Sequence, residues 1–253
     1  MSEYSQTIAK IEGFFEQQRE LYGDALYLDE KYRPQIESDN DEPVRKAIPI
    51  IEPKERRIPS APRFKQQPGK SEQMALVKNK LNAFKPKNLF GGGSLDAKLV
   101  FVAGAVADDN IRSGKVFTQQ IADLFRRMLK KISFVPNEVY MTPAIKFCCE
   151  NPGQPNENEH RLSVTILKEQ LQVIKPRYIF CLGEDSVRTL FESKRSIYEM
   201  RNRAHDLNGS HVIVSHHLGE LLQNKQLFWD VFEDMKLFRK IYDKEYGGKP
   251  PII

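Results

Sequence analysis

The stretch "KLVFVAGAVADDNIRSGKVFTQQ", residues 98–120, decides the fold. Its first part, residues 98–105, is a short apolar run rich in β-branched residues and ending at a glycine and an alanine. That pattern is typical of a strand buried on both faces. Small residues, two aspartates and an Arg-Ser-Gly-Lys turn follow before Phe117. Because such a strand end commonly holds a ligand in α/β proteins, the segment predicts a binding site directly after the strand.

Strand and helix patterns alternate four times from about residue 75 onward. This alternation predicts an α/β fold, a three-layer αβα sandwich around a central four-stranded parallel sheet. The carboxyl ends of parallel strands meet at one edge of the sheet, where a site is expected. The strands after 98–105 are predicted at 138–146, 177–183 and 211–217, and the helices at 118–132, 160–174, from 185, and 226–246. The strand ends are residues 103–109, 142–146, 183–186 and 215–219.

Length and composition restrict the class of protein. The 253 residues suffice for one α/β domain with an extension. No apolar run approaches the roughly 20 residues that span a bilayer, and the N-terminus lacks a signal-peptide pattern. A cytoplasmic protein without a membrane partner is therefore expected. Three cysteines fit reduced thiols and cannot supply four thiolates to an iron–sulfur cluster, so we expect no cofactor and no metal.

Charge and proline content divide the chain into three predicted parts. Residues 1–42 are acidic, and their apolar spacing predicts an amphipathic helix that packs on the main domain or docks a protein partner. Residues 43–72 are basic and proline-rich, as in an extended linker. Residues 73–253 form the predicted main domain. The net charge is +5, and the excess of basic residues lies in the linker and this domain. Such an excess suits binding to a polyanion such as DNA, or it serves ordinary solubility.

Several side chains near the strand ends are candidates for chemistry. A neutral imidazole at His217 could stabilise an oxyanion, or it could only cap the next helix. Asp108 and Asp109 could hold a water or act as a base, or be solvated loop residues. Phe117 follows a cation-flanked turn and could stack on an unpaired base, or belong to the core. The Gly turn and helix start at residues 182–186 could hold an anion.

The ordered series of motifs over residues 85–240 resembles the uracil-DNA glycosylase superfamily, closest to its thermostable iron–sulfur branch. The resemblance implies the αβα fold and an enzyme that flips a base out of DNA, stacks it on a Phe and reads its edge. The matching residues are Asn88, Phe90, Gly91, Gly93, Arg112, Gly114, Phe117, Thr142, Lys146, Arg201, Arg203, His205, Gly209, His217, Leu221 and Leu222.

Roles carried over from the family give a predicted site. Phe117 would be the stacking platform and His217 the donor to the departing base, with Ala105 and Thr142 also at the base. The partner would be DNA, either single-stranded or a damaged duplex. The predicted DNA contacts are Arg112, Lys115, Lys146, Arg201 and Arg203; for Arg201 and Arg203 a solvated hairpin is the alternative.

Two departures from the family pattern bear on activity. The family's water-positioning acid is Gly104 here, and its base-reading Asn is Pro143. Losing an edge-reading partner should cost about 1–3 kcal/mol, and losing an acid or base about 10²–10⁴-fold in rate. The residue pair after the histidine is also changed, to Leu218 and Gly219, and the cluster cysteines are absent, falling near Val77, Lys80, Phe147 and Ser163.

The sequence therefore predicts a DNA-binding protein related to base-excision repair, with uracil excision weakened or lost. One alternative is an active glycosylase for uracil or another deaminated base, with Asp108 or Asp109 holding the water. A second is a protein-interaction scaffold on the same fold.

Overall fold

The structure is a computed structural model that describes residues 68–148 and 155–250. The predicted acidic helical segment, residues 1–42, lies outside the described residues, as does most of the predicted linker, residues 43–72. The first described helix, α2, begins at Lys70, so the domain boundary expected at residue 73 falls inside a helix.

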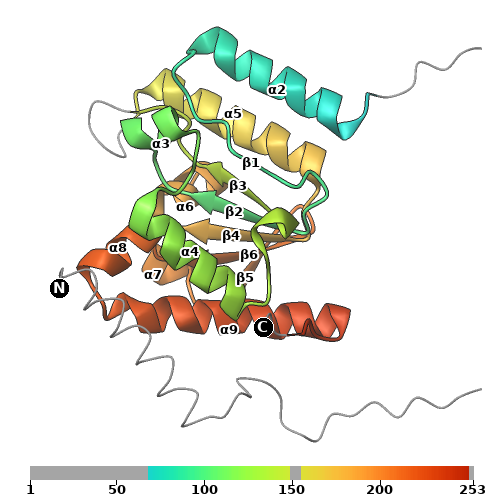
Figure 1. The fold of residues 1–253 in the computed structure, drawn as a ribbon, viewed down its shortest axis with the longest axis vertical. Coiled ribbons are helices and arrows are strands. Elements are labelled where there is room, and N and C mark those ends of the chain that lie inside the picture. Colours follow the sequence, from blue (N-terminus) through green and yellow to red (C-terminus); the bar gives the residue numbers. More distant parts are fainter. Residues whose placement is uncertain (1–67, 149–154, 251–253) are drawn as a thin grey trace, which may run out of the picture. The chain divides into compact units, whose positions relative to one another are not determined.

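One six-stranded sheet forms the centre, with the order β1-β3-β2-β4-β6-β5 (Figure 1). The four central strands are parallel, which confirms the predicted sheet, and the two short edge strands are antiparallel additions. The strands are β1 (Gly92–Gly93), β2 (Leu99–Ala103), β3 (Val139–Pro143), β4 (Tyr178–Leu182), β5 (Ala204–Leu207) and β6 (Ser210–Ser215).

The edge strands arise from local sequence. At Gly93 the backbone has φ +134°, and an added Cβ would lie 2.2 Å from the carbonyl oxygen of Val139, so only glycine fits against β3. At the other edge Leu207 pairs with Ser210, which leaves Asn208 and Gly209 as a two-residue hairpin turn, a preferred turn sequence. The segment after Arg203 therefore forms a hairpin, as one of the two interpretations of this region predicted.

Helices cover both faces of the sheet (Figure 1). Helix α2 lies alongside α5, and its residues Met74, Val77 and Leu81 belong to the core. Their three- and four-residue spacing is typical of a helix, but the predicted domain boundary at residue 73 fell within this helix. The helices are α2 (Lys70–Phe84), α3 (Asp108–Ser113), α4 (Gln119–Lys131), α5 (Glu157–Ile174), α6 (Glu184–Phe191), α7 (Ile197–Met200), α8 (Leu218–Gln223) and α9 (Leu227–Tyr246), with a 3₁₀ turn at Pro136–Glu138.

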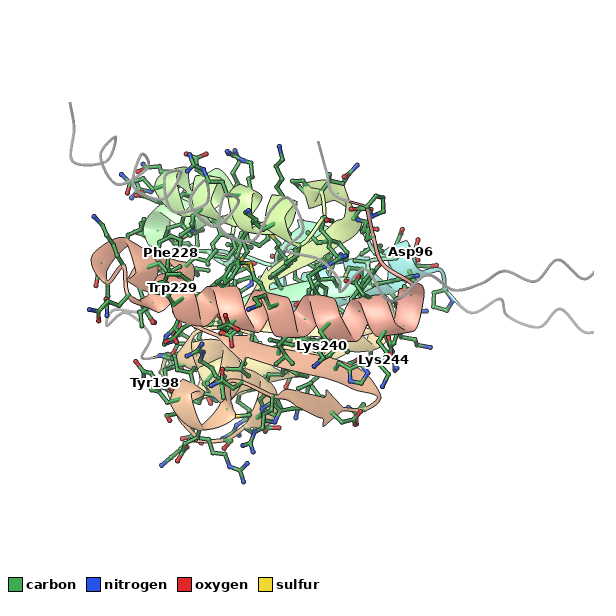
Figure 2. The ribbon with its side chains drawn as sticks, turned by 90° about the horizontal axis from the view of Figure 1, so that it is seen from below. Asp96, Tyr198, Phe228, Trp229, Lys240 and Lys244 are labelled. Atoms are coloured by element: carbon green, nitrogen blue, oxygen red, sulfur yellow. The ribbon has the colours of Figure 1, made fainter. Side chains whose placement is uncertain are left out.

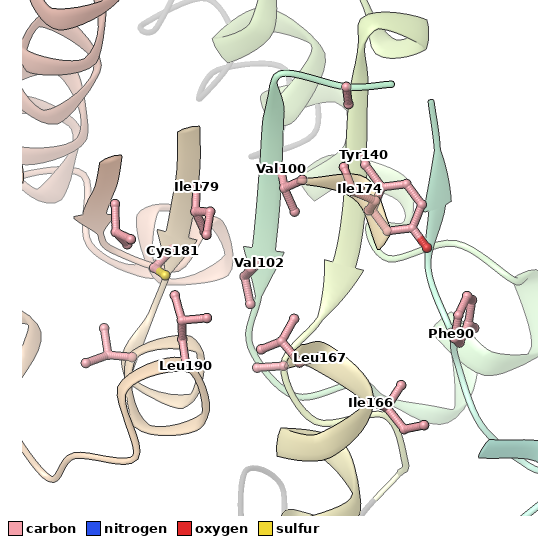
Figure 3. Packing of buried hydrophobic residues seen from close by; sticks show 14 of the residues in the cluster. Phe90, Val100, Val102, Tyr140, Ile166, Leu167, Ile174, Ile179, Cys181 and Leu190 are labelled. Carbon is pink, nitrogen blue, oxygen red and sulfur yellow. The ribbon is translucent and has the colours of Figure 1, made fainter. Parts of the chain in front are cut away.

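Two cores of different composition lie on the two faces. On the face of α5 and α6 the core is mainly aliphatic, and Val100, Val102 and Ile179 point into it (Figure 3). On the other face it is aromatic: Phe101 meets Phe125 of α4 edge-on, and Phe180 contacts Phe238 of α9. Helix α9 runs lengthwise along this face, with Trp229 in its first turn and Lys244 in its last (Figure 2).

No helix in residues 68–148 and 155–250 has the length and apolarity needed to cross a membrane.

Truncating the centre of the aromatic core should destabilise the fold strongly. Phe238 is fully buried and contacts the rings of Phe134, Tyr178, Phe180 and Tyr242. We expect Phe238→Ala to lower the free energy of unfolding by about 3–5 kcal/mol, measured by urea denaturation.

Phe84→Ala is the matched control, because that ring is 50% exposed. A loss from Phe238→Ala no larger than that from Phe84→Ala would contradict the assignment of the core.

Candidate active site

The site lies where the chain connections change face. The β2-to-β3 connection places α4 on the aromatic face, whereas α6 and α7, between β4 and β6, pack on the aliphatic face. Strands β2 and β4 are neighbours, with Val102 opposite Cys181. Connections that leave adjacent parallel strands on opposite faces open a crevice beyond their carboxyl ends. Gly104 and Gly183 follow these two ends directly.

His217 lies at this crevice, just beyond the end of β6. An added Cβ at Gly183 would lie 2.8 Å from the Cβ of His217, and the backbone there has φ +91°. Glycine at position 183 therefore leaves the space that the histidine occupies. An added Cβ at Gly104 would lie 3.5 Å from Cδ2 of the same ring. The His217 side chain thus lies close to the residues that follow both β2 and β4.

The hydrogen bond of His217 fixes its tautomer. The backbone N–H of Gly219 donates to Nδ1 at 3.2 Å, so Nδ1 carries no proton and the neutral ring holds its proton on Nε2. Burial lowers the pKa of His217, and the carboxylates of Glu220 and Asp185 offset part of that effect. A neutral ring with an N–H donor is the form predicted from the sequence, and the same bond also makes His217 the N-cap of α8.

Phe117 lies beside His217, with ring centroids 6.4 Å apart and ring planes inclined by 57°. Its ring also packs on Phe125 at 4.9 Å, and only 5% of Phe117 is exposed. The Arg-Ser-Gly-Lys turn before it leads from α3 into α4. The structure therefore brings the two principal predicted residues together, and the aromatic neighbour holds the Phe117 ring in place.

Asp185 is a functional candidate that was not among the residues matched to the family motifs. It belongs to the first turn of α6, and its Oδ2 accepts a hydrogen bond from the backbone N–H of Ala105 at 3.3 Å. Oδ2 also lies 3.6 Å from the position of an added Cβ at Gly104. The available signal was its place at the end of the third predicted strand, within residues 183–186.

The predicted acids Asp108 and Asp109 lie on α3 and have other partners. Asp108 contacts Lys87 at 2.8 Å, and hydrogen bonds with Lys87 and Cys148 lower the pKa of Asp108. Asp109 is 74% exposed and lies 3.7 Å from Arg112. Asp185 bonds Ala105, just beyond the end of β2. Among the described residues, Asp108 and Asp109 show no such bond to this strand end.

The structure corrects the predicted roles of Thr142 and Lys146. Both are fully buried on the α5 side of the sheet. The Lys146 ammonium donates to Thr142 Oγ1, to the carbonyl of Pro143 and to Gln170 Oε1. Burial holds the pKa of Lys146 well below its usual value. These two residues belong to an internal polar cluster, in which both side chains are buried and already hydrogen-bonded.

The predicted DNA contacts divide by exposure. Arg201 is only 7% exposed and bonds Asp234 Oδ2 at 2.9 Å, so its guanidinium is engaged inside the protein instead of being free for a phosphate. Arg112 and Lys115 are exposed beside Phe117 in sequence, and Arg203 is exposed at the start of the β5–β6 hairpin. These three remain candidate phosphate contacts.

Of the two adjacent histidines, only His217 belongs to the site. His216 is fully buried, and its Nε2 lies 3.1 Å from Asp230, which also contacts Arg201 at 2.9 Å. Burial raises the pKa of Asp234, the second partner of Arg201. This network ties α7 and β6 to α9.

The positions that align with cluster cysteines do not fit an iron–sulfur cluster. Val77 and Phe147 belong to the aliphatic core, and Lys80 pairs with Glu169 of α5. The hydroxyl of Ser163 accepts a hydrogen bond from the backbone N–H of Lys146 at 3.2 Å. These side chains supply no thiolate, and apolar packing of α2 on α5 fills the region.

Comparison with known proteins places this geometry in context. The model of the family described as "Uracil DNA glycosylase superfamily" matches residues 90–244, from just before β1 through most of α9. A type-4 uracil-DNA glycosylase of Thermotoga maritima is 27% identical over 159 residues, covering 61% of this chain and 83% of the relative. Similar relatives with the same name come from Sulfurisphaera tokodaii (27% over 197 residues; 71% and 90%) and Archaeoglobus fulgidus (26% over 185; 69% and 92%).

The protonation state of His217 can be measured directly. The ordinary pKa is 6.5, and burial disfavours the charged form, so the folded protein binds fewer protons at His217 than the unfolded chain as the pH falls below 6.5. We expect ¹⁵N-resolved NMR to show a neutral Nε2–H ring at pH 7 and a titration midpoint below 6.5. A proton on Nδ1, or a midpoint above 6.5, would contradict the assigned tautomer and burial.

Removing the Lys146 ammonium should affect stability. Lys146→Met removes the ammonium donor from Thr142 Oγ1 and the Pro143 carbonyl, and it leaves Gln170 Oε1 with the Thr142 hydroxyl as donor. We expect a loss of about 1–3 kcal/mol in the free energy of unfolding, measured in urea.

Lys115→Met serves as the control, since that side chain is exposed and should change stability by less than about 0.5 kcal/mol. Equal effects of the two substitutions would show that Lys146 is not part of a buried network.

Proposed function

Since the chain belongs to the uracil DNA glycosylase superfamily, we propose that it binds DNA and accommodates an extruded nucleobase against Phe117, with the edge of the base toward His217. The observation that carries this proposal is the close pairing of these two rings, 6.4 Å apart, at the crevice beyond β2 and β4. The aromatic face offers stacking, and the Nε2–H offers a hydrogen bond to a carbonyl oxygen of the base.

The relatives support DNA as the partner and repair of deaminated DNA as the setting, since those three proteins are named type-4 uracil-DNA glycosylases. Charge supports it as well: the exposed Arg112 and Lys115 flank the turn that leads into Phe117. Cations placed there can neutralise phosphates on either side of a flipped nucleotide.

Recognition of uracil itself should be weaker than in a site with an edge-reading amide. Pro143 has no side-chain donor and no backbone N–H, and its carbonyl accepts a hydrogen bond from Lys146 at 2.7 Å. This supports a protein that retains the base-binding crevice and reads the base through fewer polar contacts. Weakened uracil excision is therefore part of the proposal.

Binding of an extruded base is tested by fluorescence anisotropy with single-stranded and duplex oligonucleotides that carry an abasic, uracil or hypoxanthine position. We expect affinity to fall steeply with salt, because bound phosphates release counterions. Phe117→Ala should weaken binding to the lesion by about 1–3 kcal/mol through lost stacking.

Phe84→Ala is the matched control, because it removes a partly exposed ring of α2. DNA affinity that is absent at low salt would refute the proposal and favour a scaffold role. Affinity that is insensitive to Phe117→Ala would place the base elsewhere.

A further inference from the structure

We infer that Asp185 holds and deprotonates the attacking water in N-glycosidic bond hydrolysis, replacing the acid that is missing at position 104. The inference rests on the proposed function, because it requires a base in the crevice. It adds an activity and a catalytic residue that lies on a different element from the missing acid. The carboxylate comes from the start of α6, after β4, instead of from the end of β2.

Position supports this substitution. An added Cβ at Gly104 would lie 3.6 Å from Asp185 Oδ2 and 3.9 Å from Asp185 Cβ. A longer acidic side chain at position 104 would therefore start beside the Asp185 carboxylate. The same added Cβ would lie 3.5 Å from His217 Cδ2, so Asp185 and His217 border the same small space.

The surroundings of Asp185 suit a water-holding carboxylate. Oδ2 is anchored by the N–H of Ala105 at 3.3 Å, while the closest charged partner of Oδ1 among the described residues is Arg188, at 3.9 Å. The side chain is 21% exposed, so solvent reaches it. The carboxylate lies in the first turn of α6, where the helix dipole favours a negative charge. One oxygen is thus fixed and the other can accept a water proton.

The other carboxylates in this region contact partners outside the space between Gly104 and His217. Asp108 contacts Lys87, and Asp109 lies beside Arg112 on α3. Glu220 lies 3.5 Å from Nδ1 of His216, on the side of the buried network. Glu184 accepts a hydrogen bond from the backbone N–H of Ile197 at 3.3 Å. Among these acids, Asp185 is the one whose Oδ2 accepts the N–H of Ala105 and lies 3.6 Å from an added Cβ at Gly104.

The reaction divides between Asp185 and His217. The C1′–N bond of the nucleotide breaks, and its electron pair leaves with the base nitrogen. The water oxygen bonds to C1′, and one water proton passes to Asp185, then through solvent to the departing base. The products are a sugar with a C1′ hydroxyl and the free base. His217 Nε2–H donates to the base carbonyl oxygen on which negative charge develops.

This division of roles indicates the substrate class. The donor at His217 requires a carbonyl acceptor on the base, and uracil, hypoxanthine and xanthine each carry one. The absence of an edge-reading amide at Pro143 removes a group that would restrict the site to one base. Uracil, hypoxanthine and xanthine are therefore the probe bases for the role of Asp185.

The test measures single-turnover formation of abasic sites in oligonucleotides carrying each probe base, revealed by alkaline cleavage, together with DNA affinity. We expect the wild-type full chain to release at least one of the three bases. Asp185→Asn should lower the rate by about 10²–10⁴-fold and change the affinity less than about threefold. Glu184→Gln, which neutralises the adjacent carboxylate of the same helix, should leave the rate unchanged.

A rescue variant separates catalysis from structural support. Gly104→Glu placed in the Asp185→Asn background returns a carboxylate from the residue that follows β2, and an added Cβ there lies at ordinary contact distances of 3.5–3.9 Å. We expect this double variant to recover at least about tenfold of the lost rate, because the acid is restored in a similar place. A residue that only connects β2 to α6 would give no such recovery.

Each outcome decides a separate point. A wild type that cleaves while Asp185→Asn cleaves equally fast overturns the role of Asp185. A rate loss that Gly104→Glu does not rescue, accompanied by lost DNA affinity, assigns Asp185 to structure and also overturns it. A wild type that releases none of the bases, yet binds DNA through Phe117, overturns the inference and leaves the proposed function standing. Absence of DNA binding refutes the proposed function itself.

Discussion

The level ends of the parallel strands are the constraint on which the site depends. Val102 of β2 lies opposite Cys181 of β4, and Cys181 lies opposite Val214 of β6, so the three strands end together. Because a shift by one residue would turn every side chain to the other face, the buried pattern on both sides fixes this register. The two glycines that follow β2 and β4 then face the same histidine, and an added Cβ at Gly183 would lie 2.8 Å from the Cβ of that residue.

Much of this arrangement could be predicted from sequence. The apolar run at residues 98–105 and the three later strands gave the parallel sheet, because buried strands and amphipathic helices have distinct periods. The family pattern then placed Phe117 and His217 together, and their 6.4 Å separation agrees with it. Helix α2 was not predicted, although its apolar residues Met74, Val77 and Leu81 have helical spacing. The proline-rich segment directly before it indicated an extended linker up to residue 72.

Side-chain direction was the part that motifs could not provide. Lys146 and Arg201 match family positions, and a basic residue in a protein thought to bind DNA suggests a phosphate contact. Instead, Lys146 donates into an internal cluster, and Arg201 pairs with Asp230 and Asp234. Which face of the sheet a residue reaches depends on alternation along its own strand and on what packs there. Asp185 was overlooked for the complementary reason, since it approaches the crevice from another element.

The two short edge strands bear on how the molecule behaves in concentrated solution. Strand β1 contributes two glycines, and β5 only four residues, one of them the charged and exposed Asp206. An exposed sheet edge is a template on which another chain can add a strand, and brevity, strong twist and charge at the edge discourage that addition. A four-stranded parallel core with bare flanks would invite intermolecular pairing. The shortness of β1 and β5 and the charge of Asp206 are therefore features that discourage strand addition at the two edges of an apolar sheet.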